Sequence, residues 1–125
     1  MTTALLVGLG GFIGSASRYL ISGAVQKYAS NSWFPYGTMT VNILGCLIIG
    51  LLAGLAESRG IFTSESRAFV FIGVLGGFTT FSSFTYDTTS LIHNGQYIGA
   101  AVNVLTQVVI GLAATFIGYY VTARL

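Results

Sequence analysis

Residues 73–87 read GVLGGFTTFSSFTYD and lie inside one of four apolar segments of the chain. A glycine pair, Gly76 and Gly77, followed by two β-branched threonines is a poor centre for a regular helix. At membrane depth, backbone leaves helical geometry only where it faces protein or water. The stretch therefore predicts either a broken helix whose free backbone groups hold an ion, or a glycine kink satisfied by threonine hydroxyls.

The composition puts these segments in a membrane. Of the 125 residues, 54% are hydrophobic and only 6% are charged, against about 25% charge in a soluble domain. Mean hydropathy is +0.81. This excludes a soluble enzyme, a soluble binding module, a disordered chain and a nucleic-acid binder. The single cysteine, Cys46, excludes an intrachain disulfide and a metal site built on thiolates.

Length fixes the architecture. A spanning helix needs ~20 apolar residues, so four helices leave room only for short loops and tails. We expect one transmembrane domain over residues 1–125, with spans at residues 4–25, 36–56, 67–92 and 97–122. The fold class predicted is an all-α membrane protein with four transmembrane helices, the third broken near its middle.

Basic residues in the loops give only a weak orientation signal. Arg59, Arg67 and Arg124 fall on one side of the predicted membrane and Lys27 on the other. A chain with so weak a bias can insert both ways. We find no internal repeat, so inverted symmetry would require two chains paired in opposite orientations.

The residues after the glycine pair favour a lined pathway. If helix resumes there, Phe81 and Phe84 share one face, and Thr80, Ser83 and Asp87 share another. Phenyl rings carry positive edges, which can face an anion while hydroxyls donate hydrogen bonds to it. The alternative is that both phenylalanines fill the core.

Three other segments carry polar groups at membrane depth. Arg18 is either a functional residue or snorkels to the interface. The Asn42 amide either donates to an anion or binds a neighbouring helix. The fourth segment carries one polar and small-residue stripe that faces a partner helix or a pore: Asn103, Gln107, Gly111, Thr115 and Gly118. No catalytic constellation is found, so we expect no enzyme.

Small residues four apart occur in three segments, at Gly10 and Gly14, Gly50 and Gly54, and Gly73 and Gly77. This spacing lets helix backbones approach closely, and helix packing is the simplest interpretation.

Residues 76–84, GGFTTFSSF, closely resemble the GGxTTFSTF signature of the Fluc (CrcB-like) fluoride channel family. The similarity runs along essentially the whole chain. Arg18 follows a glycine-rich start as in that family, and residues 37–42, GTMTVN, resemble its second-helix motif. Asp87 stands where the family usually has an acidic residue.

The resemblance implies a fluoride-selective channel that exports fluoride passively and protects against its toxicity. It implies an antiparallel, dual-topology homodimer in a prokaryotic-type plasma membrane, with two fluoride pathways along the subunit interface. It also implies a structural Na⁺ at the dimer centre, held by the backbone carbonyls of Gly76 and Thr79 of both chains.

Matching motif positions imply a role for individual residues. Arg18 would lie in the vestibule. The ion pathway would contain Asn42, Thr80, Phe81, Ser83, Phe84 and Thr115. Many members have Gly-Ser in the fourth helix where this chain has Ile110-Gly111, so a hydroxyl is missing at Gly111. Thr106, Gln107 or a water would then supply the replacement donor.

A small dual-topology, proton-coupled multidrug antiporter is the alternative of similar size. That class relies on a membrane-embedded glutamate in its first helix, where this chain has Arg18 instead. A non-transporting assembly subunit is a third possibility, for which the sequence offers no positive feature.

Overall fold

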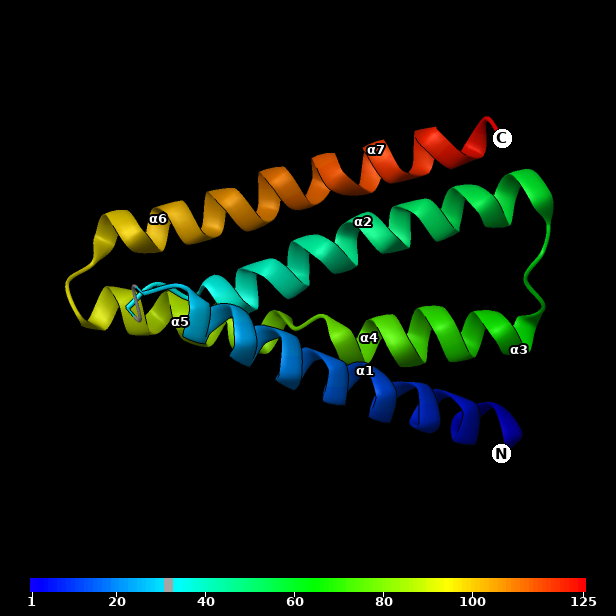
Figure 1. The fold of residues 1–125 in the computed structure, drawn as a ribbon, viewed down its shortest axis with the longest axis horizontal. Coiled ribbons are helices and arrows are strands. Elements are labelled where there is room, and N and C mark those ends of the chain that lie inside the picture. The colour runs from blue at the N-terminus through cyan, green and yellow to red at the C-terminus, as the bar shows by residue number, and fades with distance from the viewer. Residues whose placement is uncertain (31–32) are drawn as a thin grey trace.

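The computed structural model describes residues 1–30 and 33–125, and within them every regular element is a helix (Figure 1). Four helical stretches are long and apolar enough to cross a membrane: Thr2–Tyr28, Tyr36–Arg59, Ser64–His93 and Tyr97–Ala123. The prediction of an all-α protein with four membrane-spanning helices is therefore confirmed. Both termini lie at one end of the bundle, as an even number of crossings requires (Figure 1).

The first two stretches are each one continuous helix, α1 (Thr2–Tyr28) and α2 (Tyr36–Arg59). Helix α2 ends at Gly60, whose φ of 59° is left-handed. Glycine adopts this conformation without a steric cost, which explains the stop.

The third stretch is assembled from four pieces: α3 (Ser64–Arg67), the π-helical η1 (Ala68–Leu75), α4 (Gly76–Phe78) and α5 (Phe81–His93). Thr79 and Thr80 between α4 and α5 are extended, with φ/ψ of −91°/160° and −151°/117°. Gly76 keeps helical angles of −63°/−36°. The sequence predicts the weak point at the glycine pair, but the extended residues are the two threonines that follow Phe78. Extended backbone suits β-branched threonine.

Of the two glycines, Gly77 packs closely against α1, whereas Gly76 is exposed. A Cβ on Gly77 would lie 2.6 Å from the Gly11 carbonyl oxygen of α1. The same holds for the other small-residue motifs: a Cβ on Gly10 would lie 2.5 Å from the Phe69 carbonyl oxygen, and Gly50 lies against the Thr115 backbone. These motifs therefore pack helices against one another, which confirms the simplest interpretation of their spacing.

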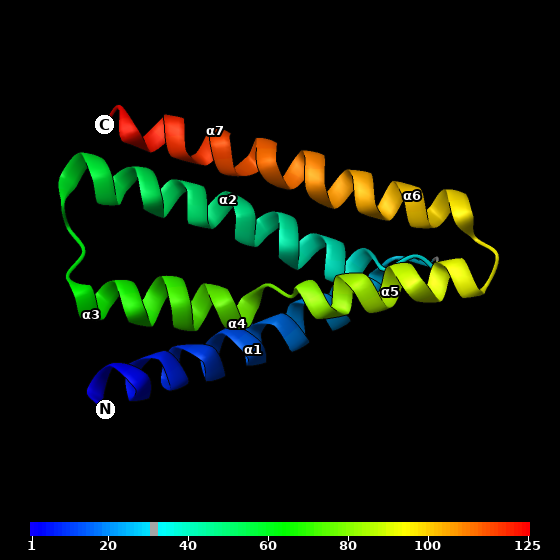
Figure 2. The ribbon, with the colours of Figure 1, turned by 180° about the vertical axis from the view of Figure 1, so that it is seen from behind.

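The fourth stretch consists of α6 (Tyr97–Leu105), the π-helical η2 (Thr106–Ile110) and α7 (Gly111–Ala123). Helix α7 runs along α2, and α1 crosses η1 and α4 (Figures 1 and 2). Helix α2 contacts α1 where Gly37 lies against Ser22, and it contacts the interruption through Asn42 and Thr80.

Much of the apolar surface is not covered within one subunit. Leu9 and Phe12 of α1 and Phe116 and Ile117 of α7 are all exposed. Such a surface is stable in lipid or against another subunit, which agrees with a multi-pass membrane protein.

Candidate ion site at the interrupted third helix

The Asn42 side chain of α2 pairs with the extended backbone of Thr80. Its Nδ2 donates to the Thr80 carbonyl at 3.0 Å, and its Oδ1 accepts from the Thr80 amide at 2.8 Å. One carboxamide thus satisfies both backbone groups, much as a neighbouring β-strand would. Because unpaired backbone groups are costly in a membrane, Asn42 stabilises the extended conformation.

The same amide begins a polar chain through the subunit. Asn42 Nδ2 also donates to Gln107 Oε1 at 2.7 Å, and Gln107 Nε2 donates to Asn103 Oδ1 at 2.9 Å. Asn103 Nδ2 in turn reaches Thr88 Oγ1 on α5 at 2.9 Å. Asn103 and Gln107 are buried. The stripe of the fourth segment therefore faces partner helices of the same subunit at these two positions.

Arg18 of α1 reaches the interruption from the other side. Its Nη1 donates to the Thr79 carbonyl at 3.2 Å, and the residue is half-buried. The guanidinium is therefore bonded to the backbone of the third stretch within the same subunit. Arg18 and Asn42 together engage both peptide carbonyls of the extended pair.

Thr80 also starts the second half of the helix. Its Oγ1 accepts from the Ser83 amide at 3.1 Å and donates to Ser83 Oγ at 3.1 Å. This is an N-cap of α5. The two hydroxyls lie together, as their spacing predicts, and the positive end of α5 is next to them.

Phe81 and Phe84 form a tilted pair just after this cap. Their ring centroids are 5.6 Å apart, with 44° between the ring planes. Phe81 is 77% exposed and Phe84 is half-buried. Within one subunit, Phe81 does not fill a core.

A pocket of about 370 Å³ brings most of the predicted site residues together. Gly45 of α2 lies against the Thr79 side chain, and its missing Cβ makes that approach possible. Sequence reasoning did not single out Gly45, although it stands three residues after Asn42. The pocket is lined by Asn42, Gly76, Thr79, Thr80, Phe81, Phe84 and Gln107, among others.

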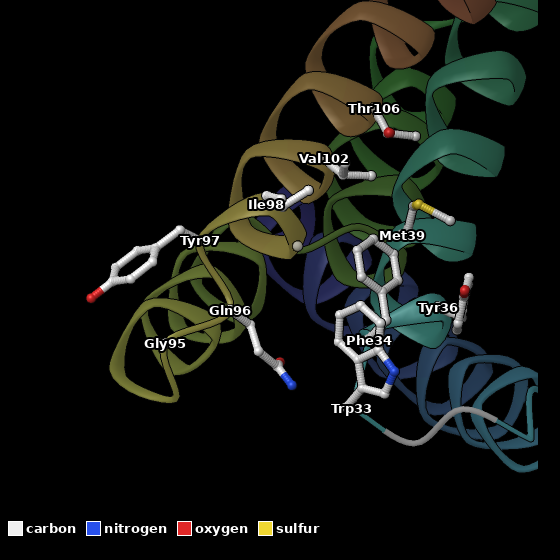
Figure 3. A pocket seen from close by; sticks show the side chains of 11 residues that line it. Trp33, Phe34, Tyr36, Met39, Gly95, Gln96, Tyr97, Ile98, Val102 and Thr106 are labelled. Carbon is white, nitrogen blue, oxygen red and sulfur yellow. The ribbon is translucent and has the colours of Figure 1, made fainter.

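Four predicted residues do not line this pocket. Arg18 and Ser83 contact the interruption directly, whereas Thr115 and Thr106 lie elsewhere. Thr115 Oγ1 donates to the Cys46 carbonyl at 3.0 Å and to the Gly111 carbonyl at 3.1 Å, at the contact of α2 and α7. Thr106 lines a different pocket of about 670 Å³, opposite Met39 and beside Val102 (Figure 3). Of the two residues suggested as replacement donors, only Gln107 lines the pocket at the interruption.

The position of the missing serine is tightly packed. Gly111 is buried, and a Cβ there would lie 3.3 Å from Cys46 Sγ. Glycine at this position lets η2 and α7 approach α2 closely.

Asp87 is engaged further along α5. It accepts from Thr38 Oγ1 at 2.7 Å, so the polar stripe of the third segment continues to α2. In the part of the chain that is described, no three His, Cys, Asp or Glu side chains gather to bind a metal. The oxygen atoms at this site belong to the backbone, to hydroxyls and to the carboxamides of Asn42 and Gln107.

The family model described as CrcB-like protein, Camphor Resistance (CrcB), matches residues 5–119. The chain belongs to this family. A relative from Methylobacillus flagellatus, named fluoride-specific ion channel FluC, is 44% identical over 119 residues, or 95% of this chain and 93% of the relative. The FluC of Geobacter metallireducens is 43% identical, covering 99% of this chain and 98% of its own length. That of Geobacter sulfurreducens is 39% identical over the whole of both chains.

Proposed function

We propose that this protein is a fluoride-selective channel of the prokaryotic plasma membrane, which lets fluoride leave the cell passively and so limits its toxicity. The relatives named as fluoride-specific channels support the transported ion. The observation that carries the assignment to this chain is the exposed Phe81 beside the Thr80 and Ser83 hydroxyls, on a face left open by the single subunit.

The chemistry of that face suits a small, strongly hydrated anion. Fluoride must exchange its water for hydrogen-bond donors and electropositive edges to pass. The Thr80 and Ser83 hydroxyls can rotate to donate, and the rings of Phe81 and Phe84 can turn their positive edges to the ion. Asn42 contributes by holding Thr80 in place, since its amide hydrogens are already engaged.

The remaining pathway positions follow from the family pattern. Gln107 is the replacement donor that we favour for the serine missing at Gly111, because its carboxamide lines the same pocket. Thr115 would act indirectly, without contacting the ion, by holding α7 against α2 next to the pathway. Arg18 would supply positive charge near the entrance, since its long side chain reaches the interruption from α1.

The working unit that we propose is an antiparallel homodimer of dual topology. The open face containing Gly76 and Phe81 is available to a second subunit, and the weak charge bias of the loops permits both orientations. Two subunits related by an axis in the membrane plane would bring their interruptions together and form two pathways along the interface.

A Na⁺ ion fits the centre of such a dimer. Backbone carbonyls at the end of a half-helix are hard, neutral ligands at the negative end of a dipole. Gly76 is exposed, and a Cβ there would meet nothing closer than the Phe71 carbonyl oxygen at 4.0 Å. The Gly76 and Thr79 carbonyls of both chains would then hold the ion, which would stabilise the assembly.

A proton-coupled multidrug antiporter finds no support. The relatives are named as channels, and the ionisable residue in the middle of α1 is Arg18, which is bonded to a backbone carbonyl. A glutamate in that position would be needed for proton exchange.

The test is ion efflux from liposomes containing the purified protein, measured separately for fluoride and chloride. We expect fluoride efflux that follows the fluoride gradient and the voltage, with chloride retained. Equal chloride efflux would refute selectivity, and efflux that follows an imposed pH gradient instead would refute a passive channel.

A further inference from the structure

The contact between Arg18 and the Thr79 carbonyl has a consequence for assembly. Helix α1 lies directly against the first half of the broken helix, because a Cβ on Gly14 would lie 2.8 Å from the Phe78 nitrogen. Arg18 follows Gly14 by one helical turn, so its guanidinium lies at the C-terminal end of that half-helix. Its Nη1 lies 3.2 Å from the Thr79 carbonyl oxygen.

A cation is the appropriate partner for this end of the half-helix. The last turn of a helix leaves carbonyl oxygens without intrahelical partners, and its dipole is negative there. Arginine stays charged under all physiological conditions and offers several N–H donors. In a single subunit, Arg18 therefore supplies the positive charge that the interrupted helix requires.

The same carbonyl is one of the proposed Na⁺ ligands. A carbonyl oxygen has two lone pairs, but both cations would then lie within a few ångström of each other. Like charges at that distance repel strongly where water is excluded. Arg18 and Na⁺ are therefore alternative partners of Thr79.

We infer that Arg18 holds the Thr79 carbonyl in the unassembled subunit, and that Na⁺ displaces its guanidinium when two subunits pair. This inference rests on the Na⁺ site of the proposed function. It makes Arg18 a positioning residue that keeps the interruption folded before assembly. On displacement, the guanidinium becomes free to face the water-filled entrance.

Competition between Arg18 and Na⁺ predicts the direction in which a substitution of Arg18 changes the Na⁺ affinity. Without the guanidinium, Na⁺ no longer has to displace a charge to reach Thr79, so Arg18→Gln should bind Na⁺ more tightly. Removing a purely structural arginine would instead weaken the site, and removing a charge used only at the entrance would leave Na⁺ binding unchanged. The control is Lys27→Gln, which removes one positive charge from the exposed end of the same helix.

The experiment measures the thermal stability and the dimer fraction of the purified protein in detergent, as Na⁺ replaces N-methylglucamine at constant ionic strength. We expect the half-effective Na⁺ concentration of Arg18→Gln to fall about tenfold or more below that of wild type, with Lys27→Gln unchanged. An equal or higher Na⁺ requirement in Arg18→Gln would overturn the inference. A wild-type protein indifferent to Na⁺ would instead refute the Na⁺ site itself.

A second measurement uses the wild-type protein, in case Arg18→Gln does not fold. Phenylglyoxal modifies free guanidinium groups, and mass spectrometry reports the modification of each arginine. We expect Arg18 to react faster in Na⁺ than in N-methylglucamine, while Arg59 at the end of α2 reacts equally in both. Equal or slower reaction of Arg18 in Na⁺ would contradict displacement.

Discussion

The pairing of Asn42 with Thr80 leads to the most informative substitution, Asn42→Ala. This change removes three hydrogen bonds, two with the Thr80 backbone and one with Gln107. The net value of such a bond is about 1 kcal/mol in water-soluble proteins and about 0.6 kcal/mol on average between membrane helices. We therefore expect Asn42→Ala to lower the free energy of unfolding by about 2–3 kcal/mol.

The same substitution should act locally at the interruption. Amide hydrogen exchange at Thr80 should accelerate, because its N–H loses its acceptor, and fluoride efflux should fall. The control is Asn94→Ala, which removes one exposed hydrogen bond to the Ser90 carbonyl and should leave all three readouts near wild type. Reversible unfolding in mixed micelles gives the free energy.

Two outcomes would separate the roles of Asn42. Lost efflux with unchanged stability and unchanged exchange at Thr80 would refute the structural role, and would leave Asn42 as a direct donor to the anion. Wild-type efflux with a clear loss of stability would remove Asn42 from the pathway.

Three further substitutions test the packing and the cap. Gly50→Ala should lower the free energy of unfolding by about 1–3 kcal/mol, because its Cβ would collide with the Thr115 carbonyl, whereas Gly8→Ala meets open space and should be neutral; equal effects would refute the helix contact. Thr80→Val should lower the free energy of unfolding by about 1 kcal/mol, because it removes the N-cap of α5, and it should also lower fluoride efflux. Thr80→Ser keeps the hydroxyl and should restore both. Wild-type efflux in Thr80→Val would exclude the hydroxyl from the pathway. Gly76→Ala should leave the single subunit folded, since Gly76 is exposed within one chain, but it should lower the dimer fraction measured by crosslinking. An unchanged dimer fraction would place Gly76 away from the interface.

The helices were predictable because long apolar runs leave the backbone no other solution in a membrane. The interruption was predictable only to within a few residues. Glycine and threonine both disfavour helix, and the choice between them depends on α1. Gly77 packs closely against Gly11 of α1. The glycine pair lies in helix α4, and the extended conformation is found at the two threonines.

The stripe on the fourth segment illustrates what spacing does predict. Its residues stand mostly four apart, more than the 3.6 residues of an α-helical turn. The π-helical η2 turns more slowly, so Asn103, Gln107 and Gly111 remain on one buried face.

The contacts of the polar residues were not predictable. The partners of Arg18 and Asn42 are backbone atoms 61 and 38 residues away, and only the packed arrangement of α1, α2 and the third stretch brings them together. Likewise, Thr115 of α7 reaches its partner on α2 only because the two helices approach each other closely. A family pattern assigns such residues to a pathway without telling which of them contact the ion.

The measurement that tests the central claim most directly compares two phenylalanines that are equally exposed in one subunit. Phe81 on α5 is 77% exposed and Phe12 on α1 is 75% exposed, but only Phe81 lies at the interruption. Each is replaced by isoleucine, which nearly keeps the volume and removes the ring edge. Fluoride efflux from liposomes is then measured for purified dimers of wild type, Phe81→Ile and Phe12→Ile.

If the pathway follows the face of Phe81, efflux should fall at least tenfold in Phe81→Ile and remain at the wild-type level in Phe12→Ile. Wild-type efflux in Phe81→Ile, from a dimer that purifies normally, would contradict the account.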